Sequence, residues 1–411
     1  MPESRSQAAA PLPLAGIRVL DVGSFIAGPA SATVMSDFGA EVIKVEAPAG
    51  DPYRYLGEQA GYPQSLHNVS WLVDSRNKRS LVLDLNKPAA RPVLEALVRR
   101  SDVFVTNFPL PVREKLRLRH DDIAPLNERL IYASLTAYGE RGPEADRTGF
   151  DSTVWWARSG LMDLVKPSPD SAPARSIPGM GDHPTALALF GAIMLALYQR
   201  ERTGKGAHVS SSLLAAGLWS NAIYVQAALA GAEIPRRPPR EESPNAMTNV
   251  YRCRDGHWFL LAGVREEWVF QQLCRVAGRQ DLADEPRFAT RAERTRNAKA
   301  LTRALDEMFR ERDWPEWLSL MRSAGITFGA VNRVEEVRGD AQMLAAGALV
   351  PFEAGSTEVP LTVDSPLRLE GQPKVTPRPA PGLGQHTGEV LAELGYDAAG
   401  ITVLRNAGAL G

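Results

Sequence analysis

One carboxylate stands at the start of the most apolar segment of this chain. Asp182 lies between Gly181 and His183-Pro184, and a nearly unbroken apolar run follows at residues 186–198. His183 and Pro184 suit the first positions of a helix, so Asp182 could accept free backbone N–H groups as an N-cap. The alternative is that the buried helix holds Asp182 where chemistry needs it.

A carboxylate at a helix N-terminus could act as a nucleophile. The helix end should stabilise the anion and lower its pKa, and N–H groups near Gly179 and Gly181 could stabilise an oxyanion. Attack by Asp182 on a thioester would give a mixed anhydride, which stays activated, whereas serine would give a less activated ester. The residue type therefore suits transfer of an acyl group between a thioester and a carboxylate.

Alternating strands and helices are predicted to position these residues. Apolar runs rich in branched residues predict buried strands at 17–22, 41–46, 80–85, 102–108 and 130–139. Helical segments fall between them, and a further helix is predicted over 185–202. Strand and helix in turn imply parallel pairing with right-handed crossovers, and hence a doubly wound α/β sheet.

The composition changes abruptly at 232–245, where prolines and charges without periodicity predict a linker. Beyond the linker, residues 246–340 predict a smaller α+β domain that opens with a hairpin turning at Asp255-Gly256. A second Pro/Gly-rich run at 370–384 leads to a closing helix from Thr387 to Leu394.

Charge and composition argue against several classes of protein. The 411 residues carry 47 Lys and Arg against 48 Asp and Glu, so no overall field favours nucleic acid or an anionic membrane. The run at 186–198 is shorter than the roughly 20 residues that span a bilayer, and residues 1–16 do not resemble a signal peptide. Two cysteines fit a reducing cytoplasm, and six histidines without ligand spacing predict no metal site.

Polar residues near the predicted strand ends are candidates for ligand binding. "RNKRS" at 76–80 precedes one strand, and Asn107 and Phe108 follow another. A flat ring, an amide and cations there could hold a base and phosphates, or they could form a solvated loop around a core phenylalanine. The first loop lacks G-x-G-x-x-G, and Glu46, where a ribose-binding acid would fall, is expected to be a surface or capping residue. Hydride transfer is therefore disfavoured.

Several segments, in their order along the chain, together resemble the family III CoA-transferases, a group that includes formyl-CoA transferase and, as a divergent branch, α-methylacyl-CoA racemase. The resemblance spans about residues 12–408 and is carried by "LAGIRVLDVGSFIAGPASATVMSDFGAEVIKVEAPAGDPYR", "NKRSLVLDL", "DVFVTNF", "YGERGPEADRTGFD", "GDHPTALALFGAIMLALYQRERTGKG" and "PAPGLGQHTGEVLAELGYD".

The resemblance implies a Rossmann-like, doubly wound large domain built from residues 12–231 and 341–411, with the small α+β domain inserted between them. Monomers of the family form open rings, and two rings interlock, so an interlinked homodimer is expected. Coenzyme A and acyl-CoA enter as substrates together with a carboxylic acid, and no permanently bound cofactor is implied.

The same resemblance assigns candidate site residues. By motif position, Asp182 is similar to the family's catalytic aspartate. Residues similar to the CoA-binding set are Ile26, Ala27, Ser75, Arg76, Asn77, Lys78, Asn107, Phe108, Lys115 and Asp151.

Departures from the family pattern concern individual contacts. Ile26 stands where formyl-CoA transferase carries Gln, Lys115 stands where Arg is usual, and "NFPLPV" replaces "NFRPGV". Trp155-Trp156 replaces a region that often contains Gln-Ala, with one extra residue. These two rings either line a pocket for an apolar acyl group or pack in the core.

The resemblance leaves three functions to weigh. The first is a CoA-transferase that works through an aspartyl mixed anhydride and an aspartyl-CoA thioester on Asp182. The second is a racemase, which needs a base on each face of the substrate; that branch places His directly before the Asp of "GFD", whereas this chain has Phe150. The third is a CoA-binding protein without catalysis. The first is favoured.

Overall fold

The computed structural model describes residues 11–410, which divide into two compact units. The larger unit consists of the residues up to 161, residues 175–226 and the residues from 342 onward, and the smaller unit of residues 162–174 and 227–341. Residues 1–10, on which most of the signal-peptide expectation falls, lie outside the described part. Among the described residues, no helix combines the length and apolarity that crossing a bilayer requires.

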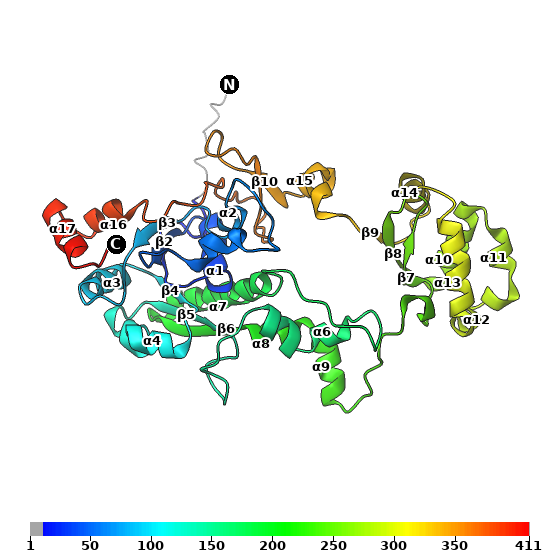
Figure 1. Cartoon of the computed structure of the whole chain (residues 1–411), viewed down its shortest axis with the longest axis horizontal. Coiled ribbons are helices and arrows are strands. Elements are labelled where there is room, and N and C mark those ends of the chain that lie inside the picture. Colours follow the sequence, from blue (N-terminus) through cyan, green and yellow to red (C-terminus); the bar gives the residue numbers. More distant parts are fainter. Residues whose placement is uncertain (1–10, 411) are drawn as a thin grey trace, which may run out of the picture. The chain divides into compact units, whose positions relative to one another are not determined.

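A six-stranded parallel sheet forms the centre of the larger unit (Figure 1). The sheet order is β3-β2-β1-β4-β5-β6, so the order reverses between β1 and β4, where open α/β sheets bind their ligands. The strands are β1 (Arg18–Asp21), β2 (Glu41–Glu46), β3 (Arg79–Val82), β4 (Val103–Thr106), β5 (Ile131–Thr136) and β6 (Ala207–Ser212).

Five of these strands coincide with the predicted runs, and the doubly wound sheet is confirmed. The edge strand β6 was not predicted. Its sequence, AHVSSS, is polar, and its side chains alternate between partly buried and exposed. An edge strand with one solvated face carries no apolar run for the pattern to detect.

Helices cover the sheet on both faces. On one face, Leu20 of β1 and Phe104 of β4 share a core with the helices α3 (Ala90–Arg99), α16 (Thr387–Glu393) and α17 (Ala398–Asn406). Alternate strand residues point to the other face, where α1 (Ala27–Asp37) packs along α7 (Asp182–Thr203). The remaining helices of this unit include α2 (Val69–Asp74), α4 (Leu110–Leu116), α5 (His120–Ile123) and α8 (Leu213–Ser220).

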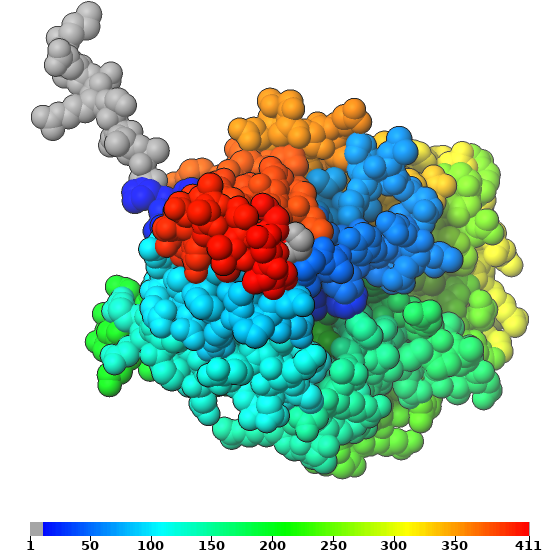
Figure 2. Space-filling view, turned by 60° about the vertical axis from the view of Figure 1, so that its left-hand side comes forward, coloured from blue at the N-terminus to red at the C-terminus, as the bar shows by residue number. Residues whose placement is uncertain are grey.

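The C-terminal segment completes the larger unit. The amide of Ser80 donates to Nδ1 of His386 (3.2 Å), and the amide of Val82 donates to Oγ1 of Thr387 (3.0 Å). Figure 2 shows this segment, in red, against the blue and cyan surface of the N-terminal part. The predicted closing helix is α16, and the unpredicted α17 follows it.

The smaller unit has its own sheet and core. The predicted hairpin is present: β7 (Thr248–Arg252) pairs antiparallel with β8 (Trp258–Ala262), and Gly256 in the turn has φ 89°. The third strand is β9 (Phe328–Ala330). Cys253 and Cys274 are buried and free. The helices are α10 (Glu266–Ala277), α11 (Gln280–Asp284), α12 (Arg291–Arg296), α13 (Ala298–Phe309) and α14 (Trp314–Ser323).

Gly206 joins α7 to β6 where no side chain fits. A Cβ at this position would overlap the backbone carbonyl of Leu130, and the amide of Gly206 donates to the carbonyl of Glu128 (2.8 Å).

We expect Gly206→Ala to lower the free energy of unfolding by about 1–3 kcal/mol, because the backbone must shift to relieve the overlap. Gly388→Ala, in an exposed position of α16 with no atom within 4 Å, is the control and should be close to neutral. Equal urea midpoints for the two variants would contradict this account.

Candidate active site

Asp182 is the first residue of α7 and lines a cavity of about 760 Å³. The N-cap of the helix is Gly181, without a side-chain capping bond, so the prediction that Asp182 is the N-cap is wrong. Four of the predicted CoA-binding residues line the same cavity: Ile26, Ala27, Asn107 and Asp151. The structure therefore brings the predicted nucleophile together with part of the predicted binding set.

The electrostatic surroundings of Asp182 are the reverse of those expected from a helix N-terminus. Burial, followed by the nearby carboxylate of Asp151, raises the pKa of Asp182 to about 7, and Asp74 acts in the same direction. The charge of His183 opposes this shift. The sequence indicated only a helix end beside Asp182. Folding also buries the carboxyl group and brings two carboxylates from distant segments close to it, and the net effect is a raised pKa.

Asp151 is fixed by two backbone amides. It caps a π-helix, η3 (Ser152–Arg158), where its Oδ1 accepts from the amide of Ser152 (2.7 Å), and its Oδ2 accepts from the amide of Gly181 (3.1 Å). The Gly181 amide is therefore engaged and is not free for an oxyanion, contrary to expectation. Within residues 11–410, the amide of Gly179 has no hydrogen-bond partner, and this glycine lines the cavity.

The two tryptophans pack in the core and do not line this cavity. Trp155 and Trp156 are each 7% exposed, and their rings stack with centroids 6.0 Å apart. A Cβ on Gly181 would come within 2.6 Å of the Trp155 ring, so this ring supports the loop before Asp182. Hydrogen bonds in η3 span five residues, as from the amide of Trp156 to the carbonyl of Asp151 (2.8 Å). A π-helix accommodates one extra residue within a helical turn.

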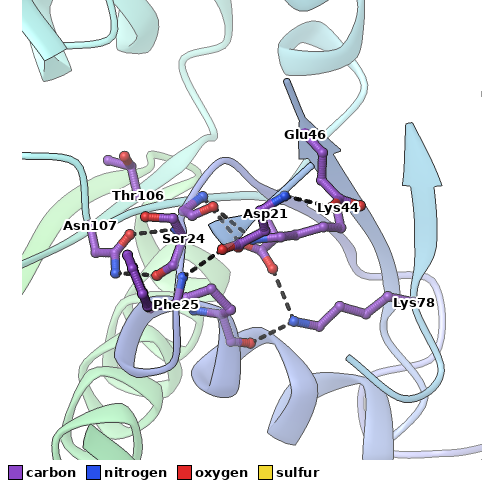
Figure 3. Close-up of polar contacts among 12 residues, drawn as sticks. Asp21, Ser24, Phe25, Lys44, Glu46, Lys78, Thr106 and Asn107 are labelled. Atoms are coloured by element: carbon purple, nitrogen blue, oxygen red, sulfur yellow. Dashed lines mark hydrogen bonds and ion pairs between the residues drawn. The ribbon is translucent and has the colours of Figure 1, made fainter. Parts of the chain in front are cut away.

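Buried ion pairs join the ends of the first strands (Figure 3). Nζ of Lys78 lies 2.9 Å from Oδ2 of Asp21 at the end of β1. Nζ of Lys44, on β2, lies 3.7 Å from Oδ1 of Asp21 and 2.9 Å from Oδ2 of Asp51. We call these four residues the charge network; its two lysine side chains and that of Asp21 are fully buried. Lys78, the residue directly before β3, thus reaches Asp21 at the end of β1.

The charge network holds the loop that follows β1. The carbonyl of Gly23 accepts from Nζ of Lys44 (2.7 Å), and the amide of Phe25 donates to Oδ1 of Asp51 (3.0 Å). Phe25 has φ 58°, a left-handed conformation that is rare for a bulky residue. The contacts of the network overcome the cost of this conformation, and the residues that follow, Ile26 and Ala27, line the cavity.

Asn107 holds the same loop from the end of β4. Its Oδ1 accepts from the amide of Ser24 (2.8 Å), and its Nδ2 donates to the carbonyl of Ser24 (2.7 Å). The close approach favours glycine at position 28, where a Cβ would lie 3.1 Å from Cβ of Asn107. Asn107, which the resemblance assigned to CoA binding, therefore uses its side-chain amide to hold the loop. The residue also lines the cavity.

The other predicted binding residues lie elsewhere in the larger unit. Asn77 and Lys78 line a second cavity, of about 790 Å³, and the Lys78 ammonium group is paired with Asp21 in the charge network. Arg76 is buried in a bidentate pair with Asp37. The three remaining residues also lie outside the first cavity: Ser75 is buried, Phe108 packs against the sheet core, and Lys115 is exposed on α4.

Two functional features escaped the sequence reasoning. Glu46 was expected to be a surface or capping residue. It is buried, with Oε1 2.7 Å from Nε of Arg54, and the same oxygen accepts from the amide of Asp51. The charge network was not predicted either. The available signal was the presence of Asp21, Lys44 and Glu46 within apolar strands, since a charge inside a buried strand requires a partner.

Comparison with known proteins agrees with this architecture. The family model for CoA-transferase family III matches residues 14–387. The chain is 32% identical to (R)-2-hydroxy-4-methylpentanoate CoA-transferase of Clostridioides difficile, over 93% of this chain and 96% of the relative. It is also 32% identical to succinyl-CoA:glutarate CoA-transferase of Mus musculus, over 97% and 90%.

A solved structure is similar over nearly the same length. The CAIB/BAIF family protein from Brucella suis superposes with a TM-score of 0.82 at 29% identity, covering 94% of this chain and all of that one. The parallel sheet and its helices therefore match a known fold as well as a known sequence family. Together these matches show that the chain belongs to CoA-transferase family III and is a CoA-transferase.

Proposed function

We propose that this enzyme moves CoA from an acyl-CoA thioester to a free carboxylic acid through covalent intermediates on Asp182. The observation that carries the proposal is the position of Asp182, a carboxylate that lines a cavity of about 760 Å³ together with the loop held by Asn107 and the charge network. Family membership supplies the thioester substrate. A pKa near 7 leaves about half of the Asp182 carboxylates ionised at neutral pH.

The first half of the reaction produces an aspartyl thioester. An ionised oxygen of Asp182 attacks the thioester carbonyl carbon, the carbon–sulfur bond breaks, and CoA leaves as a thiolate that stays bound. The product is a mixed anhydride between Asp182 and the acyl group. The thiolate then attacks the γ-carbon of Asp182, the anhydride bond breaks, and the donor acid leaves as its carboxylate. Charge is conserved in both steps, and no proton moves.

The second half runs the same steps in reverse with another acid. The acceptor carboxylate attacks the γ-carbon of the aspartyl-CoA thioester and again releases the thiolate. The thiolate then attacks the acceptor's own carbonyl carbon, and Asp182 leaves as a carboxylate. CoA is a substrate in this scheme, and no permanently bound cofactor takes part.

The residues around the cavity support binding of an anionic thioester. Arg147 and Arg175 line the cavity as cations, and Ile26 and Ala27 form its wall beside the loop. We keep Asn107 and Asp151 as candidate contacts to CoA. For Lys78 we propose support of the loop through Asp21, because its ammonium group is fully buried. Lys115, exposed on α4, stays a predicted contact to CoA.

We also propose that the enzyme is an interlinked homodimer. Large apolar side chains that are well exposed on α7, α8 and α9 (Ala222–Leu229) support this proposal, since surfaces of this kind mark protein interfaces. Leu195 and Tyr198 are 72% and 58% exposed, and Trp219 and Ile223 are 83% and 84% exposed.

Light scattering at low micromolar concentration should give twice the mass of one 44.7 kDa chain. The mass should persist on dilution, because interlinked chains separate only by unfolding. A stable monomer in native buffer would contradict the proposal. Trp219→Asp should reduce the yield of folded dimer, whereas Arg296→Asp, at an exposed helix position of the smaller unit, is the matched control and should not.

Proton abstraction at the α-carbon is the alternative reaction, and the cavity disfavours it. Phe150 directly precedes Asp151, lines the cavity, is 58% exposed and lies edge-on to Phe25 with centroids 5.6 Å apart. A phenyl ring cannot accept a proton, so one of the two bases that racemisation needs is missing at this position. The two rings instead provide an apolar surface for an acyl group.

Exchange of the α-proton should therefore be absent or very slow. We expect a chiral 2-methylacyl-CoA incubated in deuterated water to keep its α-hydrogen and its configuration over many CoA-transfer turnovers. Mass spectrometry of the thioester measures incorporation, with an enzyme-free sample as control. Rapid enzyme-dependent incorporation would place the racemase reaction above CoA transfer.

Replacing the nucleophile tests the main proposal. Asp182→Asn keeps the size of the side chain but removes the attacking anion, so kcat for CoA transfer should fall by at least about 10³-fold while CoA binding persists. Asp121→Asn, at a 97% exposed aspartate of α5, is the control and should leave kcat unchanged. A screen of acyl-CoA donors against free acids supplies the assay. If Asp182→Asn turned over an established substrate pair at a near-normal rate, Asp182 would not be the nucleophile.

A further inference from the structure

His183, the residue after Asp182, begins a hydrogen-bonded chain that leads away from the cavity. Its Nε2 lies 3.0 Å from Oδ1 of Asp74, and Oδ2 of Asp74 accepts from the hydroxyl of Tyr53 (2.6 Å). The Asp74 side chain is 3% exposed. Its backbone carbonyl also accepts from the hydroxyl of Thr33. None of these residues takes part in the reaction as described above.

The chain of hydrogen bonds is anchored by three separate elements. Asp74 ends α2, Thr33 belongs to α1, and Tyr53 lies on the short 3-10 helix η1 (Pro52–Glu58). The imidazole of His183 lies against Gly179, where a Cβ would come 3.1 Å from Nδ1. Asp74 and the backbone at Gly179 therefore hold the ring from two sides, and its orientation does not depend on a substrate.

The anionic groups around Asp182 need a compensating charge. Asp151 approaches from the turn before η3, Asp74 from α2, and the Tyr53 hydroxyl also faces this cluster. Among the charged side chains that act on Asp182 in the described residues, His183 is the one that favours the ionised carboxylate. Burial alone would lower the pKa of His183, but the hydrogen bond and charge of Asp74 outweigh burial and raise it. Asp74 therefore favours the charged form of the ring.

We propose that His183 is a positioning residue of the reaction, whose imidazole, held by Asp74 and through it by Tyr53, places positive charge next to Asp182 and favours the attacking carboxylate. The proposal rests on the assignment of Asp182 as nucleophile. Tyr53 and Asp74 act through His183 and do not touch the substrate. In this arrangement the charge of His183 opposes the effect of burial and of the other two carboxylates on Asp182.

The sign of the expected pH effect follows from this arrangement. Protonated Asp182 cannot attack, so kcat/KM rises with pH through the pKa of Asp182, which lies at about 7. Loss of the charge on His183 removes the one stabilising cation, and the midpoint moves to higher pH. One opposite charge at close range changes the pKa of a carboxylate by about one unit or more.

Carbon-13 NMR of the whole enzyme, labelled at the aspartate γ-carbons, measures this titration without a substrate. The signal that disappears in Asp182→Asn belongs to Asp182. We expect its midpoint to rise by about one pH unit or more in His183→Gln and to return toward the wild-type value in His183→Lys, which restores a cation. The imidazole is 48% exposed, so both side chains can be accommodated.

A matched control is His208→Gln. Nε2 of His208 lies 3.0 Å from Oγ of Ser134 and 3.3 Å from Oε2 of Glu140, so this ring, like that of His183, contacts a carboxylate. His208 does not act on Asp182. Its replacement should leave the midpoint unchanged. The acid limb of the kcat/KM profile should move with the NMR midpoint in each variant.

An unchanged Asp182 midpoint in a folded His183→Gln enzyme would overturn the proposal. Such a result would leave the nucleophile assignment intact, provided that Asp182→Asn is inactive. Conversely, transfer by Asp182→Asn would remove the nucleophile assignment itself. The two failures are thus distinguished by different variants.

Discussion

The pairing of Lys78 and Lys44 with Asp21 and Asp51 is the interaction on which the rest of the site depends. Four charges taken out of water at the end of β1 are stable only while each has its partner. Removing one partner would leave an uncompensated buried charge, at a cost of about 3–5 kcal/mol. Because the network also binds the backbone of Gly23 and Phe25, it fixes the loop at the switch point of the sheet in one conformation.

The two ends of this site use carboxylates in opposite ways. At Asp21, burial would raise the pKa, but Lys44 and Lys78 outweigh burial and lower it, so the carboxylate is a permanent anion with a structural role. At Asp182, burial acts together with Asp151 and Asp74, and the pKa rises to about 7. A saturated ion pair is inert, whereas a carboxylate without a direct donor keeps its lone pairs available for attack. The fold thus separates the supporting anion from the carboxylate that we propose to be the nucleophile.

How far the sequence predicts this molecule depends on whether a feature is local. Periodicity predicted β1 to β5, because buried strands are apolar runs, and the resemblance to the family indicated Asp182 and the residues that share its cavity. The pKa of Asp182 could not be predicted, since Asp151 and Asp74 approach it only after folding. The pairing of Lys78 with Asp21 could not be predicted for the same reason. The two residues lie 57 positions apart in the sequence, and the parallel pairing of the strands brings them together. Trp155 and Trp156 were left open between a pocket and the core, and the π-helix turns both rings into the core.

The central claim is that an oxygen of Asp182 forms a bond to the acyl group, and an oxygen label tests it most directly. In the proposed scheme, the acceptor acid attacks the γ-carbon of Asp182 and later leaves one of its own oxygens there. A single turnover with an acceptor acid labelled in both carboxyl oxygens with ¹⁸O should therefore leave one ¹⁸O in the peptide that contains Asp182, measured by mass spectrometry after digestion, and one in the new thioester. An unlabelled Asp182 peptide after complete turnover would contradict covalent catalysis by this residue.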